Sequence, residues 1–130
     1  MREPRTIAIR LVCPARFRQC ATCACVWQLL DDKLEKAGAD LILIHFGYDN
    51  ALAGVIAAKE LNIPSILWLH GSDMHTVPHR SLEWMASQVS KVMTNSQYSL
   101  RLLAQLEIKK NVTFSYLGAD LEKFCPSIQS

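Results

Sequence analysis

Two histidines of this sequence stand where short apolar runs end, and a glycine follows each of them closely. His45 precedes Gly47 by two residues, and His70 directly precedes Gly71. A neutral imidazole can donate or accept a hydrogen bond with a hydroxyl or a phosphate, and glycine lets a ligand approach the backbone closely. The pattern indicates two ligand-binding loops, although histidines that merely end strands would give the same pattern.

Asp73 and Ser96 are further candidates, each with two interpretations. Asp73 completes the motif HGSD, in which an aspartate contacts a ligand or simply begins a helix. Ser96 precedes a helical pattern, where it either meets an anion beside free N–H groups or caps the helix.

A metal site is the less favoured interpretation of the other histidines and of the cysteines. His75 and His79 follow His70, but their spacing lacks the HExxH pair of a zinc protease. Cys20 and Cys23 form one CxxC pair, which would suit a redox site at a helix start or, with other cysteines, a zinc site. We expect ordinary free thiols in a reducing compartment, no bound metal and no cofactor.

The two histidines belong to a strand–helix–strand pattern. Both apolar runs are almost unbroken, as expected of strands buried on both faces, and a crossover helix between them makes the strands parallel. The same alternation continues along the chain. It predicts strands at Thr6–Val12, Leu41–His45, Ile66–Leu69, Lys91–Thr94 and Val112–Leu117.

Four helices are predicted. They span about residues 22–37, the stretch from Asp49 or Asn50 to Leu61, Arg80–Ser90 and Ser96–Leu106. Asp49 or Asn50 is the expected cap of the second helix, and residues 70–79 are expected to form a long polar connection. The inward face of the second helix is predicted to be Leu52, Val55, Ile56 and Leu61.

These elements predict an α/β fold with a Rossmann-like open parallel sheet of about five strands. Ligands bind outside the carboxyl ends of such strands, so His45, His70, Ser96 and Gly118 are expected at one edge. Right-handed crossovers between sequential strands place every helix on one face. The other face then needs a cover, from another half of the domain, a second domain or a partner subunit.

Composition excludes several classes of function. The formal net charge is +2 over 130 residues, without the basic stripe that nucleic-acid binding requires. The first residues lack the apolar core of a signal peptide, and no apolar run approaches the roughly 20 residues of a membrane span. We expect a cytoplasmic protein with at most peripheral membrane contact.

Three segments together resemble the N-terminal, acceptor-side domain of the family-4 retaining glycosyltransferases, which have the GT-B fold. Residues 39–73 resemble the family's D-x-I-H-A-H-F-G … G-I-P … H-G-x-D stretch, with HFG and HGSD closest to exopolysaccharide enzymes. Residues 92–103, VMTNSQYSLRLL, resemble a V-S-E-x-x-R-x-x-L strand and helix. Residues 115–126, SYLGADLEKFCP, resemble the G-V-D-L-x-R-F-x-P segment that ends the first domain.

The resemblance implies two Rossmann-like domains that face a cleft, a nucleotide-sugar donor, and a saccharide or lipid-linked acceptor that meets this domain. No bound metal is required by the family. The resemblance implies a catalytic role for His70 beside the sugar-transfer centre. The implied substrate-binding residues are His45, Gly47, Gly71, Asp73, Ser96 and Gly118.

The departures from the family limit what we expect of this chain. Residues 1–33 contain no glycine, so the family's Gly-rich first loop is absent, and Leu43 replaces the first histidine of an H-x-H pair. No paired-glutamate motif of a donor-binding domain is present. We therefore expect a divergent head at 1–33, a glycosyltransferase-like domain at 34–126, a tail at 127–130, and no activity from the chain alone. The alternative is a non-catalytic α/β fragment that acts as an interaction module.

Overall fold

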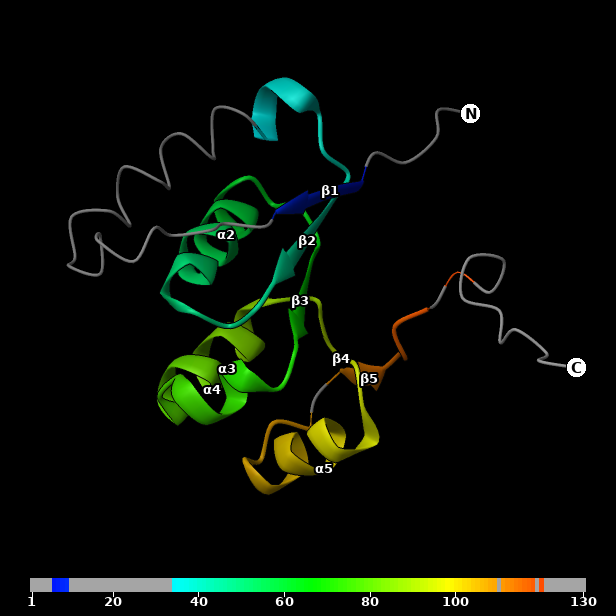
Figure 1. Ribbon diagram of the computed structural model, residues 1–130. Coiled ribbons are helices and arrows are strands. Elements are labelled where there is room, and N and C mark those ends of the chain that lie inside the picture. Colours follow the sequence, from blue (N-terminus) through cyan, green and yellow to red (C-terminus); the bar gives the residue numbers. More distant parts are fainter. Residues whose placement is uncertain (1–5, 10–33, 110, 119, 121–130) are drawn as a thin grey trace, which may run out of the picture.

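The structure, a computed structural model, describes residues 6–9, 34–109, 111–118 and 120 (Figure 1). Its five-stranded sheet has the order β1-β2-β3-β4-β5, and every neighbouring pair is parallel. The prediction of an open, sequential, parallel α/β sheet is therefore confirmed. The strands are β1 (Thr6–Ile9), β2 (Leu41–His45), β3 (Ser65–Leu69), β4 (Lys91–Thr94) and β5 (Val112–Phe114).

Four described helices connect strands β2 to β5, and a further helical turn occupies residues 34–37. Among the described helices, none is long and apolar enough to cross a membrane. The predicted helix residues 22–33 and strand residues 10–12 lie outside the described part of the chain. The connecting helices are α2 (Asp49–Glu60), α3 (Ser72–Thr76), α4 (His79–Gln88) and α5 (Gln97–Gln105).

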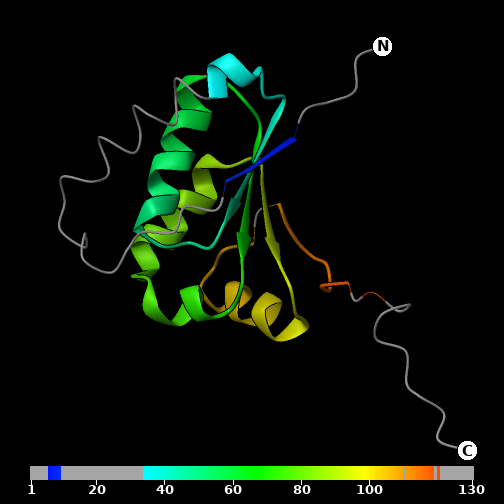
Figure 2. The same ribbon diagram turned by 45° about the horizontal axis from the view of Figure 1, so that its top comes forward.

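One face of the sheet packs against the helices and forms the hydrophobic core with them. Alternate residues of the central strands are fully buried there, because α2 and α4 lie on that side of the strands (Figures 1 and 2). Burying such side chains stabilises the fold by about 1.5–3 kcal/mol each. The sheet contributes Ile42, Ile44, Leu67, Leu69 and Val92, and the helices contribute Val55, Leu82, Met85 and Leu103.

The opposite face of the sheet is only partly covered. Leu43 of β2 lies beside Ile66 of β3, and Trp68 lies beside Met93 of β4. All four residues are half-buried, whereas their neighbours along the strands are buried on the helix side. The described chain thus has the uneven coverage expected of sequential right-handed crossovers.

Helix α2 packs on β2 through small side chains, and this corrects the predicted inward face. Ile56 is 37% exposed, whereas Ala57 and Ala58 are buried. Gly54 lies over Ile44, because a Cβ at Gly54 would come within 3.3 Å of an Ile44 side-chain carbon. The backbone of the helix therefore approaches the sheet closely, and alanines fill the interface that larger residues were expected to fill.

Three boundaries also differ from the sequence-based expectation. The N-cap of α2 is Tyr48, with no side-chain cap, rather than Asp49 or Asn50. Residues 70–79 contain α3, which is only five residues long and too short to show a helical period. Strand β5 ends at Phe114, because among the described strands it pairs with β4 alone, and β4 ends at Thr94.

Candidate functional site

The two candidate histidines lie in contact at the carboxyl edge of the sheet. His45 is the last residue of β2, and His70 directly follows β3. His45 Nδ1 lies 3.1 Å from His70 Nε2, and the two rings are stacked with their centroids 5.3 Å apart. Parallel strands bring the two residues together although 25 positions separate them in the sequence.

Two further aromatic residues complete this cluster. Trp68 pairs with His45 in the β2–β3 register, and the centroid of its ring lies 5.2 Å from that of His45 and 5.3 Å from that of His70. The Phe46 ring lies 4.3 Å from His70. Trp68 Nε1 is buried and has no hydrogen-bond partner among the described residues. The His70 ring therefore has three aromatic neighbours, the rings of His45, Phe46 and Trp68.

Phe46 has a backbone conformation that is unusual for a bulky residue. Its φ of 65° lies in the left-handed region, which costs of order 1–3 kcal/mol for a residue other than glycine. The Phe46 N–H donates to the Trp68 carbonyl at 2.9 Å, so the strained residue is held on β3. A turn is expected from Gly47 onward, but a positive φ at the preceding phenylalanine is not expected from its residue type.

Asp73 lies beneath the histidines rather than on the surface. Its side chain is 0% exposed. Four backbone N–H groups donate to its carboxylate, from Gly47 at 2.9 Å, His70 at 3.1 Å, Gly71 at 2.9 Å and Met74 at 3.1 Å. Charge-assisted hydrogen bonds of this kind are among the strong ones. One carboxylate thus holds together the loops that carry the two histidines.

Gly47 and Gly71 are required by this arrangement for different reasons. A Cβ at Gly47 would lie 2.7 Å from a Leu82 methyl and 2.8 Å from a Leu69 methyl. Tight packing therefore leaves no room for a side chain at this position. Gly71 has a φ of 104°, a conformation that L-residues rarely adopt. Gly71 is also the N-cap of α3.

Ser96 lies just beyond the carboxyl end of β4, whereas Gly118 lies further beyond the end of β5 at Phe114 and is not brought against the histidine loops. The Ser96 side chain caps α5 by accepting the N–H of Ser99 at 3.1 Å, and its hydroxyl donates to Ser99 Oγ at 2.9 Å. Ser99 Oγ is 3.9 Å from the place of a Cβ on Gly71, so Ser96 borders the histidine loops. Gly118 is exposed, and no described heavy atom lies within 4 Å of its Cβ position.

Side-chain contacts tie the ends of α2, α3 and α5 together along this edge. Tyr48, just before α2, has its hydroxyl 2.9 Å from Ser72 Oγ on α3. His75 on α3 stacks on Tyr98 of α5 with ring centroids 6.4 Å apart. The edge therefore presents aromatic and hydroxyl groups around His70, which suits a ligand rich in hydroxyls.

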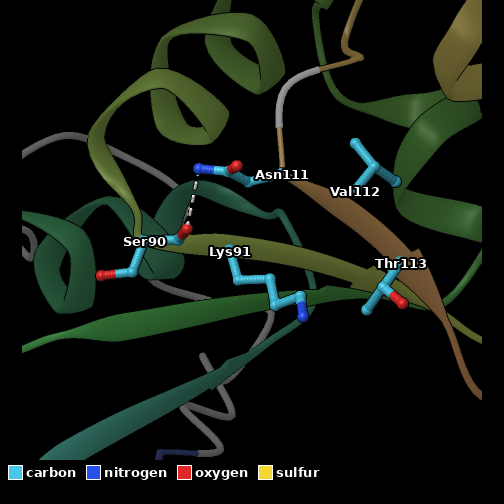
Figure 3. Close-up of a pocket in the computed structure, with 5 residues that line it drawn as sticks. All are labelled: Ser90, Lys91, Asn111, Val112 and Thr113. Atoms are coloured by element: carbon cyan, nitrogen blue, oxygen red, sulfur yellow. Dashed lines mark hydrogen bonds between the residues drawn. The ribbon is translucent and has the colours of Figure 1, made fainter.

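Two surface hollows lie at the opposite, amino edge of the sheet. Figure 3 shows one between the starts of β4 and β5, where Asn111 Nδ2 donates to the Ser90 carbonyl at 3.2 Å. Lys91 and Thr113 also line it. These hollows are shallow and polar, and they contain none of the predicted site residues.

The described residues contain no group of three or more His, Cys, Asp or Glu side chains able to hold a metal ion. His79 is separate from the histidine pair, since its Nε2 lies 2.8 Å from the Leu106 carbonyl. The cluster of Cys13, Cys20, Cys23 and Cys25 lies outside the described part, so the expectation of free thiols stays a prediction.

Comparison with known proteins places these features in a family. A search of curated proteins finds no match. The family model described as Glycosyltransferase Family 4 matches residues 3–123, which is nearly the whole chain and includes all of the site residues above. The parallel sheet is that of a Rossmann-like GT-B half. The chain belongs to glycosyltransferase family 4 and corresponds to the N-terminal part of these enzymes.

Proposed function

We propose that the chain forms the acceptor-side half of a sugar-transfer cleft. The donor is a nucleotide-sugar, and the acceptor is a saccharide or a lipid-linked saccharide. The observation that carries the proposal is the contact between His45 and His70 at the carboxyl edge of a family-4 domain. Ligands of open α/β sheets bind at this edge, and imidazoles suit sugar hydroxyls and phosphates.

His70 has the central role in this proposal, because it contacts the sugar at the reacting centre. Ser96 and the surrounding loops bind the rest of the substrates. Asp73 and Gly47 contribute by shaping those loops, since both are buried and hydrogen-bonded to each other. The residues proposed to contact the substrates are His45, Gly71, Ser96 and Gly118, whereas Gly47 and Asp73, predicted from the sequence as substrate-binding, are buried and support the loops instead.

Transfer requires a second, donor-binding domain, and we propose that the chain alone is inactive. Catalysis in a two-domain cleft depends on holding the donor in line with the acceptor. The described residues form a single parallel sheet, which would supply one wall of such a cleft. The resemblance of HFG and HGSD to exopolysaccharide enzymes supports retaining transfer in cytoplasmic polysaccharide biosynthesis, with at most peripheral membrane contact.

The test supplies the donor-binding domain of a family-4 enzyme, fused after residue 126, and measures sugar transfer from a panel of nucleotide-sugars to oligosaccharides. We expect transfer with retained anomeric configuration, and its loss when His70→Ala is introduced. His79→Ala is the matched control, because His79 is an exposed histidine outside the cluster. Equal activity of the His70→Ala and His79→Ala fusions would contradict the proposal.

A second candidate function is that of a non-catalytic interaction module. The half-covered sheet face favours it, because Leu43, Ile66, Trp68 and Met93 give that face an apolar surface. In this case the face binds a partner subunit or second domain, and the histidine edge has no substrate. A fusion that binds a partner but transfers no sugar from any donor would favour this function over the first.

A further inference from the structure

We infer that His45 is a positioning residue that acts through His70, fixing the orientation and the tautomer of the His70 imidazole. The consequence for sugar transfer rests on the proposed function, whereas the hydrogen bond itself is testable without turnover. Three observations lead to this inference: the support of the His70 ring, the single hydrogen between the two rings, and the rigid strand that carries His45.

The His70 side chain is supported on several sides although the residue lies in a loop. Phe46, Trp68 and His45 place their ring centroids 4.3, 5.3 and 5.3 Å from that of His70. Its backbone N–H donates to the buried Asp73 carboxylate at 3.1 Å. A ring packed in this way has little freedom to rotate, so its remaining variable is the position of its hydrogen.

Only one hydrogen can lie between His45 Nδ1 and His70 Nε2, which are 3.1 Å apart. If His70 Nε2 carries it, a neutral His70 ring has an acceptor at Nδ1. If His45 Nδ1 carries it, the neutral His70 ring has its hydrogen on Nδ1, which is then a donor. The tautomers of His45 and His70 are therefore coupled through this hydrogen, which sets whether His70 Nδ1 is a donor or an acceptor.

His45 is well placed to be the fixed partner of the pair. It ends β2 and is paired in register with Trp68 of β3, so its backbone belongs to the central sheet. The next residue, Phe46, donates its N–H to the Trp68 carbonyl at 2.9 Å. Groups on strands are positioned more precisely than groups on loops, so the strand residue orients the loop residue.

The experiment measures histidine ring nitrogens by NMR on the isotope-labelled 130-residue chain. We expect a through-hydrogen-bond coupling between His45 Nδ1 and His70 Nε2, and one dominant tautomer of His70. This measurement needs no substitution, so it remains valid even if a variant fails to fold. Absence of the coupling, with His70 present as a mixture of tautomers, would overturn the inference.

Two substitutions at position 45 separate the hydrogen bond from the ring contacts. His45→Phe keeps an aromatic ring but removes the nitrogen, and we expect His70 to become a tautomer mixture. His45→Asn places an amide group near the former Nδ1, and we expect one tautomer to be restored. His79→Phe, which changes a histidine outside the cluster, is expected to leave the His70 signals unchanged. A His70 tautomer that is the same in all these variants would refute the role of His45.

Measuring kcat of the fused enzyme provides a second test. We expect His45→Phe to lower kcat by about 10²-fold, as misplacement of a reacting group does, with partial rescue by His45→Asn. Suppose that the His70 tautomer changes with the residue at position 45, but that the fusion never transfers sugar. This result would support the inference and overturn the proposed function. Full activity of an active His45→Phe fusion would overturn the inference and keep the proposed function.

Discussion

Asp73 and Gly47 are joined by a buried hydrogen bond of 2.9 Å, although 26 positions separate them in the sequence. The bond connects the loop after β2 with the loop after β3. Because the same carboxylate also accepts the N–H groups of His70 and Gly71, the arrangement of the histidine pair depends on one buried side chain. The geometry of the histidine pair and the stability of this edge are therefore linked.

Asp73→Ala is expected to destabilise the chain by about 3 kcal/mol or more, because each buried donor left without a partner costs about 1–3 kcal/mol. Asp73→Asn is expected to cost somewhat less, since its amide oxygen can still accept while its NH₂ group faces other donors. Urea denaturation measures both changes. Glu83→Ala, an exposed change on α4, is the control and is expected to stay within about 0.5 kcal/mol. A destabilisation by Asp73→Ala no larger than this control would show that the carboxylate does not hold the loops.

Gly71→Ala is expected to lower the free energy of unfolding by about 1–2 kcal/mol. The cause is backbone strain at a φ of 104°, since the nearest atom to the new Cβ, Ser99 Oγ, is 3.9 Å away and does not clash. Gly118→Ala is the matched control, because no described heavy atom lies within 4 Å of its Cβ position and no left-handed φ is required there. Thermal unfolding that shifts equally in both variants would contradict this explanation.

His70→Ala is expected to change stability little and function strongly. The residue is only half-buried, so we expect a loss of about 1 kcal/mol or less in the free energy of unfolding. In the fused enzyme the same substitution should abolish sugar transfer. Circular dichroism and a transfer assay on the same preparation test both statements. A variant that unfolds would mean that His70 serves the fold instead.

The unfused chain is expected to transfer no sugar from any nucleotide-sugar. The donor must be held in line with the acceptor before transfer can occur, and the proposed second domain supplies that hold. A radiolabelled transfer assay with the chain alone is the measurement. Any turnover by the chain alone would show that one domain suffices.

Much of the fold was predictable because unbroken apolar runs identify buried parallel strands. The runs at β2 and β3 gave the strand order, and the parallel order then placed His45 and His70 at one edge. Their direct contact was not predicted, because the strand register decides it. The register pairs His45 with Trp68, and no pattern of residue types encodes that offset.

The rest of the site depends on tertiary contacts that leave little trace in the sequence. An aspartate near a helix start is usually exposed, yet Asp73 points into the protein and accepts backbone N–H groups. The positive φ of Phe46 reflects the turn that brings Gly47 to this carboxylate. Helix α3 has only five residues, too few to show a helical period, so the sequence alone indicates a loop there. In the sequence, the motif HGSD is the one signal that points to Asp73 and the loops it holds together.

The most direct test of substrate binding at the carboxyl edge is an NMR titration of the labelled chain with nucleotide-sugars and with oligosaccharides. We expect backbone amide shifts to change at the carboxyl edge, at Gly47, His70, Gly71 and Ser96. We expect no change at Lys91 and Thr113, which line the hollow at the amino edge. Shift changes confined to the amino edge, or no changes with any of these probes, would contradict the claim that this edge binds sugar substrates.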